Sequence, residues 1–281
     1  MATIERGDGR IDYAVHGAGA PLVILRGLGR SVRHWLGYER VLARHFQVIT
    51  LDLRGVGATT AASRLTTSVF DMADDVVAVL DALSLPTAHI LGVSLGGMVT
   101  LAMGLRHPER CRSLITVNTS IAGQGTSRIT RGALRAMTAV VSRDRDLIHS
   151  RLVDVLVGTD VPSAQRPAIA REYAVIAREQ GLFARTVVKQ LVAAARFRVG
   201  EALPSMTVPT MVVYGTADRF VPNVNSRNLA ARLPDAQLVA IEGGGHELTL
   251  DKGEELAAQV QRWVREVEGR PLKSARNPPN S

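Results

Sequence analysis

A serine flanked by glycines stands between a strand-like run and a helix-like run, and this feature constrains the fold most. The segment Gly92-Val93-Ser94-Leu95-Gly96 follows the apolar run 88–91 and precedes the helical pattern 98–105. A serine on a sharp strand-to-helix turn exposes its hydroxyl, and glycines are needed where the backbone is crowded. The pattern therefore predicts that Ser94 is a nucleophile at the end of a buried strand.

A carboxylate and an imidazole follow two later strand-like runs. The apolar run 210–214 leads into a loop that carries Asp218, and the run 237–241 leads into a glycine-rich loop that carries His246. Loops at the carboxyl ends of parallel strands meet at one edge of a sheet. His246 has a pKa suited to a general base, and Asp218 would orient and stabilise the imidazolium.

Two backbone N–H groups are expected to meet the negative charge that develops on a substrate oxygen. One belongs to Leu95, at the start of the predicted helix, where the helix dipole is positive. The other comes from the loop after the strand-like run 22–25, where the segment Arg26-Gly27-Leu28-Gly29 makes Leu28 the candidate. Leu28 and Leu95 would form an oxyanion hole through their backbones alone.

The order serine, aspartate, histidine, together with several short motifs, resembles the α/β-hydrolase family. Besides the G-x-S-x-G turn, the segments Asp52-Leu53-Arg54-Gly55-Val56-Gly57, His107-Pro108-Glu109-Arg110 and Asp218-Arg219-Phe220-Val221-Pro222 are similar to turns of that family. The resemblance runs from about residue 10 to about residue 267 and is nearest to serine-nucleophile esterases and lactonases with a helical cap. It implies an α/β fold with a mostly parallel sheet, helices on both faces and an inserted helical cap.

Apolar runs and helical patterns alternate along most of the chain. An opening hairpin is expected around the turn 7–9, and the residues 32–44 read as one helix. Strands separated by helices need crossover connections, which favour a mostly parallel sheet.

The strand pattern stops between residues 121 and 205, where apolar residues recur at helical spacing. We expect residues 1–120 and 206–268 to form the α/β core and residues 121–205 to form a helical cap that walls the substrate pocket. The last residues, 269–281, contain three prolines and no apolar period, and are expected to form a loose tail.

One position departs from the family pattern beside the expected oxyanion loop. Arg26 stands where the family usually has histidine. Arg26 would either approach an anionic group of the substrate or pair with a carboxylate such as Asp52, and the sequence does not choose between them. Trp35 and Phe220 are further candidates for substrate contact, although large apolar residues are more often part of a core.

Charge and composition limit the classes of partner. The net charge is +8, but the basic residues are spread along the chain and aromatic residues make up only 4%, so we expect no nucleic-acid partner. The uncharged stretch 82–105 is divided by a proline and several glycines, so we expect no membrane partner. No cofactor and no metal are expected, because no dinucleotide, phosphate-binding or paired-histidine motif is found.

The single cysteine, Cys111, cannot form an intrachain disulfide, and the first residues lack an apolar signal segment, so a cytoplasmic location is expected.

The predicted function is cofactor-independent hydrolysis of a small-molecule carboxylic ester or lactone through an acyl-enzyme, with an acidic substrate as one option. Two alternatives stay open: hydrolysis of a carbon–carbon bond in a ring-fission product, and a non-catalytic ligand-binding homologue. The oligomeric state is equally open.

Overall fold

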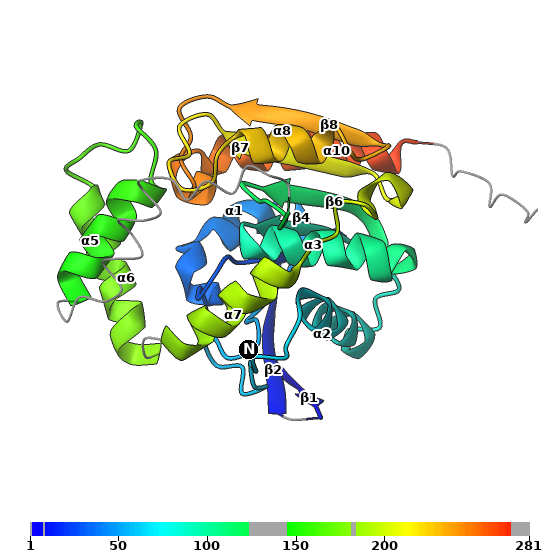
Figure 1. The fold of residues 1–281 in the computed structure, drawn as a ribbon, viewed down its shortest axis with the longest axis horizontal. Coiled ribbons are helices and arrows are strands. Elements are labelled where there is room, and N and C mark those ends of the chain that lie inside the picture. Colours follow the sequence, from blue (N-terminus) through cyan, green and yellow to red (C-terminus); the bar gives the residue numbers. More distant parts are fainter. Residues whose placement is uncertain (1, 8, 124–144, 181–183, 271–281) are drawn as a thin grey trace, which may run out of the picture.

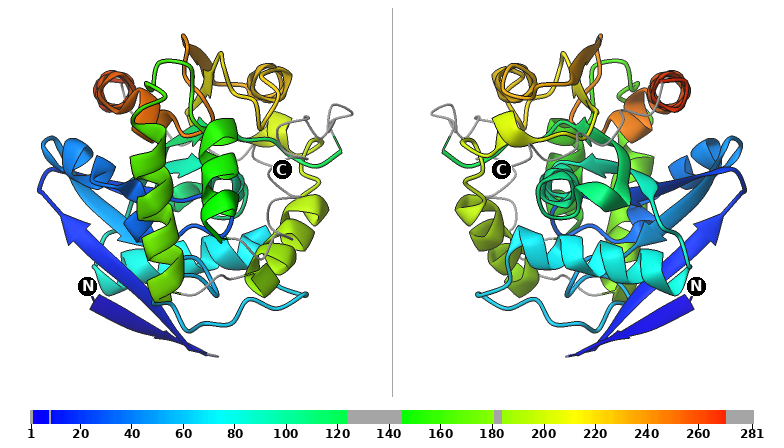
Figure 2. Two further views of the ribbon diagram at one scale, coloured as in Figure 1. Left: turned by 90° about the vertical axis from the view of Figure 1, so that its left-hand side faces the viewer. Right: turned by 90° about the vertical axis from the view of Figure 1, so that its right-hand side faces the viewer.

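The computed structural model describes the whole chain except residues 1, 8, 124–144, 181–183 and 271–281. Its described strands form one sheet in the order β1-β2-β4-β3-β5-β6-β7-β8, with helices packed on both faces (Figures 1 and 2). The strands are β1 (Ala2–Arg6), β2 (Gly9–His16), β3 (Ala20–Leu25), β4 (Phe46–Leu51), β5 (Ala88–Val93), β6 (Cys111–Val117), β7 (Thr210–Gly215) and β8 (Ala236–Ile241).

The sheet is mostly parallel. Strands β1 and β2 form the expected antiparallel hairpin, and β2 also pairs antiparallel with β4. All the other neighbouring strands run parallel. The predicted α/β architecture is therefore confirmed.

Alternate residues of the central strands, β3 to β7, pack into two different layers. In β3, Val23 and Leu25 belong to one hydrophobic cluster, while Leu22 and Ile24 belong to the other. The first cluster includes residues of α2 (Val69–Ala82), α3 (Leu95–Arg106) and α8 (Val224–Ala230), and the second includes residues of α1 (Tyr38–Ala43) and α10 (Gly253–Glu268). Burial on both faces explains why these strands read as continuous apolar runs.

The helix predicted over residues 32–44 is wrong in one respect, because the structure breaks it in two. A 3₁₀ turn, η1 (Val32–Trp35), is followed by α1, and between them Leu36 has φ 50° and Gly37 has φ 95°. Two consecutive left-handed residues cannot continue a right-handed helix. Short 3₁₀ turns also lie at η2 (Pro108–Arg110) and η3 (Leu203–Ser205).

Three described helices occupy the chain between β6 and β7: α5 (Arg145–Leu156), α6 (Arg166–Gln180) and α7 (Ala184–Arg196). In Figure 1, α5 and α6 stand at the end of the sheet toward which the arrowhead of β8 points, and in the left view of Figure 2 they lie in front of the sheet. Part of the predicted cap, in which Leu134, Met137 and Val141 recur at helical spacing, falls outside the described residues. No described helix is long and apolar enough to cross a membrane.

The predicted tail falls mostly outside the described residues as well. At its start, the Arg270 guanidinium contacts both carboxylate oxygens of Asp235, the shorter distance being 2.8 Å. The remaining helix is the short α9 (Leu248–Asp251), which directly precedes α10.

Candidate active site

The loops that follow β3, β5, β6, β7 and β8 open at one edge of the sheet. The strand register aligns Leu25 of β3 with Gly92 of β5, and Gly215 of β7 with Ile241 of β8. The residues directly after these strand ends include Arg26, Ser94 and the loops of Asp218 and His246. The parallel topology therefore collects segments that are far apart in the sequence.

Ser94 has a backbone conformation that L-residues rarely adopt, with φ 56° and ψ −116°. It lies directly between β5 and α3. A Cβ atom on Gly92 would stand 2.1 Å from the carbonyl oxygen of Gly96, and one on Gly96 would stand 2.4 Å from that of Leu25. The two glycines thus let the start of α3 pack against the ends of β5 and β3, as expected for a nucleophile turn.

The aspartate and the histidine of the later loops contact each other. Nδ1 of His246 lies 2.8 Å from Oδ2 of Asp218, and both side chains are buried. The other carboxylate oxygen of Asp218 accepts hydrogen bonds from the backbone N–H groups of Phe220 and Val221, at 2.7 and 2.9 Å. The Asp218 carboxylate is therefore held by its own loop while it orients the imidazole.

Burial by itself would lower the pKa of His246, but the Asp218 carboxylate outweighs it, so the pKa is raised above its ordinary value. The Ser94 hydroxyl forms no hydrogen bond with any described residue, His246 included. Hydrogen bonds between a nucleophile and its base are often long without substrate and tighten in the complex.

The end of β6 links the serine turn to the histidine loop. The side-chain amide of Asn118 donates to the carbonyl oxygens of Gly245 and His246, both at 2.9 Å, and its oxygen accepts from the backbone N–H of Gly215. The hydroxyl of Thr119 donates to the carbonyl oxygen of Ser94 at 2.7 Å. The sequence analysis missed these two residues, although polar side chains directly after a buried strand would have marked them.

The expected oxyanion amides lie beside the serine. A Cβ atom on Gly27 would stand 3.2 Å from the Cβ of Ser94 and 3.7 Å from its Oγ, so the Gly27-Leu28 backbone borders the hydroxyl. Leu95 is the first residue of α3. Neither the N–H of Leu28 nor that of Leu95 donates a hydrogen bond to a described residue, so both donors are available to a ligand.

Arg26 pairs with a carboxylate, as one of the two alternatives expected, but the partner is Glu247 and the suggested partner Asp52 is wrong. The Arg26 side chain is 1% exposed, and its Nη2 lies 3.0 and 3.1 Å from the two carboxylate oxygens of Glu247. Asp52 instead accepts from the backbone N–H groups of Val32 and Ala58, at 2.7 and 3.0 Å. The Arg26–Glu247 pair therefore ties the expected oxyanion loop to the residue after His246, and no sequence signal singled out Glu247.

Two of the candidate substrate contacts are sealed from solvent. Trp35 is 1% exposed, belongs to the second hydrophobic cluster and lies under the guanidinium of Arg26, whose Cζ stands 4.6 Å from the ring centroid. Arg26 and Trp35 therefore offer a ligand no open surface in this structure. Phe220 is half-buried, and its ring centroid lies 4.8 Å from that of His246.

The α5–α7 segment contacts the same loops. Gln190 of α7 accepts from the N–H of Gly29 at 2.9 Å, and the N–H of Glu247 donates to the carbonyl oxygen of Leu156. Oδ2 of Asp251 accepts from the N–H groups of Gly158 and Gly245, both at 2.7 Å. Burial raises the pKa of Asp251 to about 6 despite these two hydrogen bonds. Side-chain and backbone contacts thus hold this segment on the histidine and oxyanion loops.

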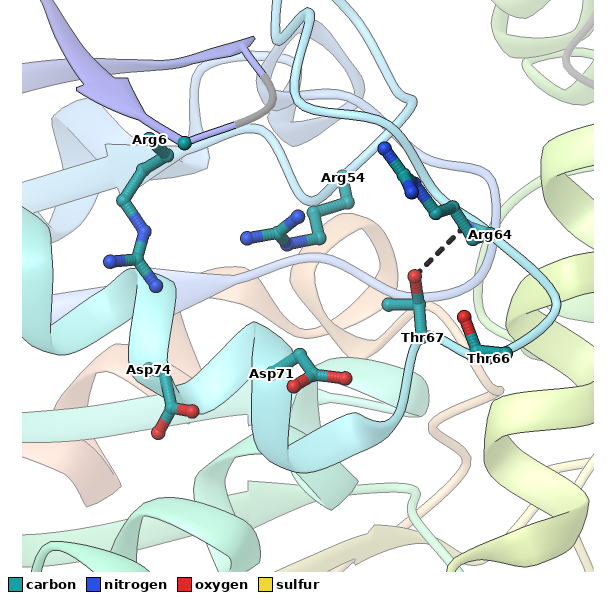
Figure 3. A pocket seen from close by; sticks show the side chains of 8 residues that line it. Arg6, Arg54, Arg64, Thr66, Thr67, Asp71 and Asp74 are labelled. Carbon is teal, nitrogen blue, oxygen red and sulfur yellow. Dashed lines mark hydrogen bonds between the residues drawn. The ribbon is translucent and has the colours of Figure 1, made fainter.

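A separate pocket of about 500 Å³ opens near the hairpin and the start of α2 (Figure 3). It is lined by Arg6, Gly7, Arg54, Arg64, Thr66, Thr67, Asp71 and Asp74. Asp71 accepts from the N–H of Ser68 as a helix cap, and Asp74 contacts Arg106 and His107. No described serine, cysteine or histidine lines this pocket. Among the described residues, no cluster of three or more His, Cys, Asp or Glu side chains could hold a metal ion.

Comparison with known proteins identifies the family. A family model described as alpha/beta hydrolase fold matches residues 20–253. The chain belongs to the α/β-hydrolase fold family. It is 33% identical to RutD of Caulobacter segnis, a protein with the provisional name carbamate hydrolase. The match extends over 253 residues and covers 85% of this chain and 91% of that protein.

Solved structures agree with this assignment. An N-acyl homoserine lactone degrading enzyme is 27% identical to this α/β hydrolase, with a TM-score of 0.78 over 94% of this chain and 100% of that one. A meta-cleavage product hydrolase from Pseudomonas fluorescens has a TM-score of 0.81 at 21% identity, over 95% of this chain and 98% of that one. At 21% identity, the similarity to the meta-cleavage product hydrolase supports the fold alone.

Proposed function

We propose that this α/β hydrolase is a cofactor-independent serine hydrolase that cleaves a small-molecule carboxylic ester or lactone through an acyl-enzyme. The observation that carries the proposal is the 2.8 Å contact between Nδ1 of His246 and Oδ2 of Asp218, on loops that open at the same sheet edge as Ser94. A histidine held at Nδ1 by a carboxylate keeps Nε2 as the proton acceptor.

In the proposed reaction, Ser94 Oγ attacks the substrate carbonyl while Nε2 of His246 takes the hydroxyl proton. Asp218 stabilises the imidazolium, and the N–H groups of Leu28 and Leu95 bind the oxyanion. The imidazolium then protonates the leaving alcohol. A water molecule, deprotonated by the same imidazole, hydrolyses the acyl-enzyme and restores Ser94.

We further propose that residues 121–205 act as the cap of this site. The support is the set of contacts that join α5–α7 to Gly29, Gly245 and Glu247, on two of the loops that surround the serine. Such a wall excludes water from the bound carbonyl and selects the substrate by shape.

The names of two similar proteins add carbamates and acyl homoserine lactones to the substrates worth assaying. A carbamate, the bond in the name of the RutD relative, offers a carbonyl to the same nucleophile, and so does the lactone of the 27% identical structure. Hydrolysis of a carbon–carbon bond would use the same three side chains. These are different substrates for one mechanism.

A substrate panel tests the proposal. We expect turnover of a 4-nitrophenyl ester or an acyl lactone, a burst of about one equivalent of nitrophenolate, and an acyl adduct on the peptide that contains Ser94. Turnover of a vinylogous diketone without ester turnover would favour carbon–carbon hydrolysis. Reversible ligand binding with no turnover of any substrate would favour a non-catalytic homologue.

The pH profile of kcat/KM is expected to fall on the acid side with an apparent pKa above 6.5, because His246 acts as a neutral base and its pKa is raised. In Asp218→Asn the carboxylate no longer opposes the effect of burial, so the acid limb should move to lower pH while turnover falls by roughly 10⁴-fold. Initial rates from pH 5 to 9 measure both. If the acid side of the pH profile had the same apparent pKa in Asp218→Asn as in the wild type, the role assigned to Asp218 would be contradicted.

A further inference from the structure

The expected oxyanion loop is followed by a second arginine, Arg30, which forms no ion pair with a described residue. Arg30 is half-buried, and its backbone N–H donates to the carbonyl oxygen of Gly27 at 3.2 Å, which closes a tight turn. Gly27 is the residue whose Cβ position lies 3.7 Å from Ser94 Oγ. Arg30 therefore starts from a backbone position one turn away from the proposed nucleophile.

The Arg30 side chain points from this loop to the α5–α7 segment. Its Cζ lies 4.2 Å from the ring centroid of Tyr173 in α6, and Tyr173 is itself fully buried. Stacking on an aromatic ring uses the face of a guanidinium and leaves the N–H groups along its edge free. The contact with Tyr173 thus holds the Arg30 guanidinium in place without using its hydrogen-bond donors.

The neighbouring arginines differ from Arg30 in having carboxylate partners. Arg26 contacts Glu247, and Arg33 contacts Glu179 of α6. No described carboxylate lies within ion-pair distance of Arg30, and no described acceptor takes a hydrogen bond from its side chain. Among the described residues, Arg30 therefore forms no ion pair and no side-chain hydrogen bond, although its charge does act on Glu247 from a distance.

The charges around it leave a positive surplus. Arg26 and Arg30 both act on Glu247, whose pKa is lowered even though burial alone would raise it. Burial, and then the charges of Arg30 and Arg26, lower the pKa of His34 to about 2, so this imidazole is neutral. The ring centroid of His34 lies 5.2 Å from that of Tyr173. Two guanidinium groups thus face one carboxylate, in surroundings where an unpaired charge is costly.

We propose that Arg30 binds a carboxylate of the substrate, so that the preferred ester or lactone is one that carries a carboxylate group. The planar fork of a guanidinium matches the two oxygens of a carboxylate, and a bidentate pair of this kind is strong and directional. This inference rests on the proposed function, since it assigns the substrate of the same site.

The test compares two esters of equal length that differ in charge: mono(4-nitrophenyl) glutarate, which ends in a carboxylate, and its methyl ester. The wild type is expected to favour the anionic ester in kcat/KM by about tenfold or more. In Arg30→Met the ratio of the two kcat/KM values should fall by about 10- to 100-fold. Arg30→Lys keeps the charge but loses the fork, so its ratio should lie between the two.

The matched control is Arg33→Met, which removes an exposed arginine of the same segment and should leave the ratio unchanged. The inference would be overturned if the ratio of kcat/KM for the anionic ester to kcat/KM for the methyl ester were the same in the wild type and in Arg30→Met. A wild-type preference for the methyl ester would overturn it as well. Thermal unfolding of each variant shows whether it has folded.

A binding measurement separates this inference from the proposed function. If neither ester is turned over, the proposed function fails, and calorimetry with glutarate still decides the role of Arg30. Glutarate binding that is lost in Arg30→Met supports the carboxylate site. Glutarate binding that is equal in both proteins, or absent from the wild type, overturns it.

Discussion

Ser94→Ala is expected to lower the turnover of esters by about 10⁴-fold or more and to abolish labelling by a fluorophosphonate. In the proposed mechanism the Ser94 hydroxyl oxygen becomes acylated, and Ser94 is the residue at the strand-to-helix turn between β5 and α3. The measurements are steady-state rates with a 4-nitrophenyl ester and the mass of the protein after exposure to the probe.

The fold should survive this change. The backbone N–H of Ser94 donates to the carbonyl oxygen of Val117, and its carbonyl oxygen accepts from the Thr119 hydroxyl, so both interactions remain in alanine. Ser205→Ala, at an exposed serine outside the site, is the matched control and should keep full activity and full labelling. Labelling that persists in Ser94→Ala would assign the nucleophile to another serine.

The fold was predictable because its central strands, β3 to β7, are buried on both faces. These strands appear as mostly apolar runs, and their alternation with helices leaves a mostly parallel sheet as the natural arrangement. The break at Leu36 and Gly37 was not predictable from periodicity, because apolar spacing continues through it; the only local signal was Gly37, a residue type that readily adopts a left-handed conformation.

The site shows a similar division between local and long-range features. The loops of Ser94, Asp218 and His246 follow strand ends and carry residue types that acyl chemistry needs, so local reasoning selects them. The partner of Arg26 is 221 residues away, and nothing in the local sequence distinguishes Glu247 from Asp52 as that partner. β3 and β8 are separated by three strands in the sheet, so the two loops meet only in the folded structure.

The buried Arg26–Glu247 pair gives the second large expected effect. Arg26→Met should lower the free energy of unfolding at pH 7 by about 3–5 kcal/mol, because it leaves a buried carboxylate without its partner. Chemical denaturation measures this loss. Arg33→Met removes an exposed partner of Glu179 and should cost about 1 kcal/mol or less. If Arg26→Met lowered the free energy of unfolding by only about 1 kcal/mol, the buried pair would contribute no more to stability than an exposed one.

The sign of the pH dependence distinguishes a lost pair from lost packing. In the wild type, burial would raise the pKa of Glu247, but Arg26, together with the charges of Arg30 and His246, outweighs it. The stabilisation is therefore present above the unfolded pKa of about 4.3 and is lost as the pH falls through the folded pKa. Without Arg26, the folded carboxyl should bind a proton at higher pH. The deficit of Arg26→Met should therefore be largest near pH 7 and shrink toward pH 4. Replacing both residues, as in R26M/E247L, removes the buried charge and should recover much of the loss at pH 7. A deficit that is independent of pH and unchanged in the double variant would trace the effect to the packing of Arg26 on Trp35 instead.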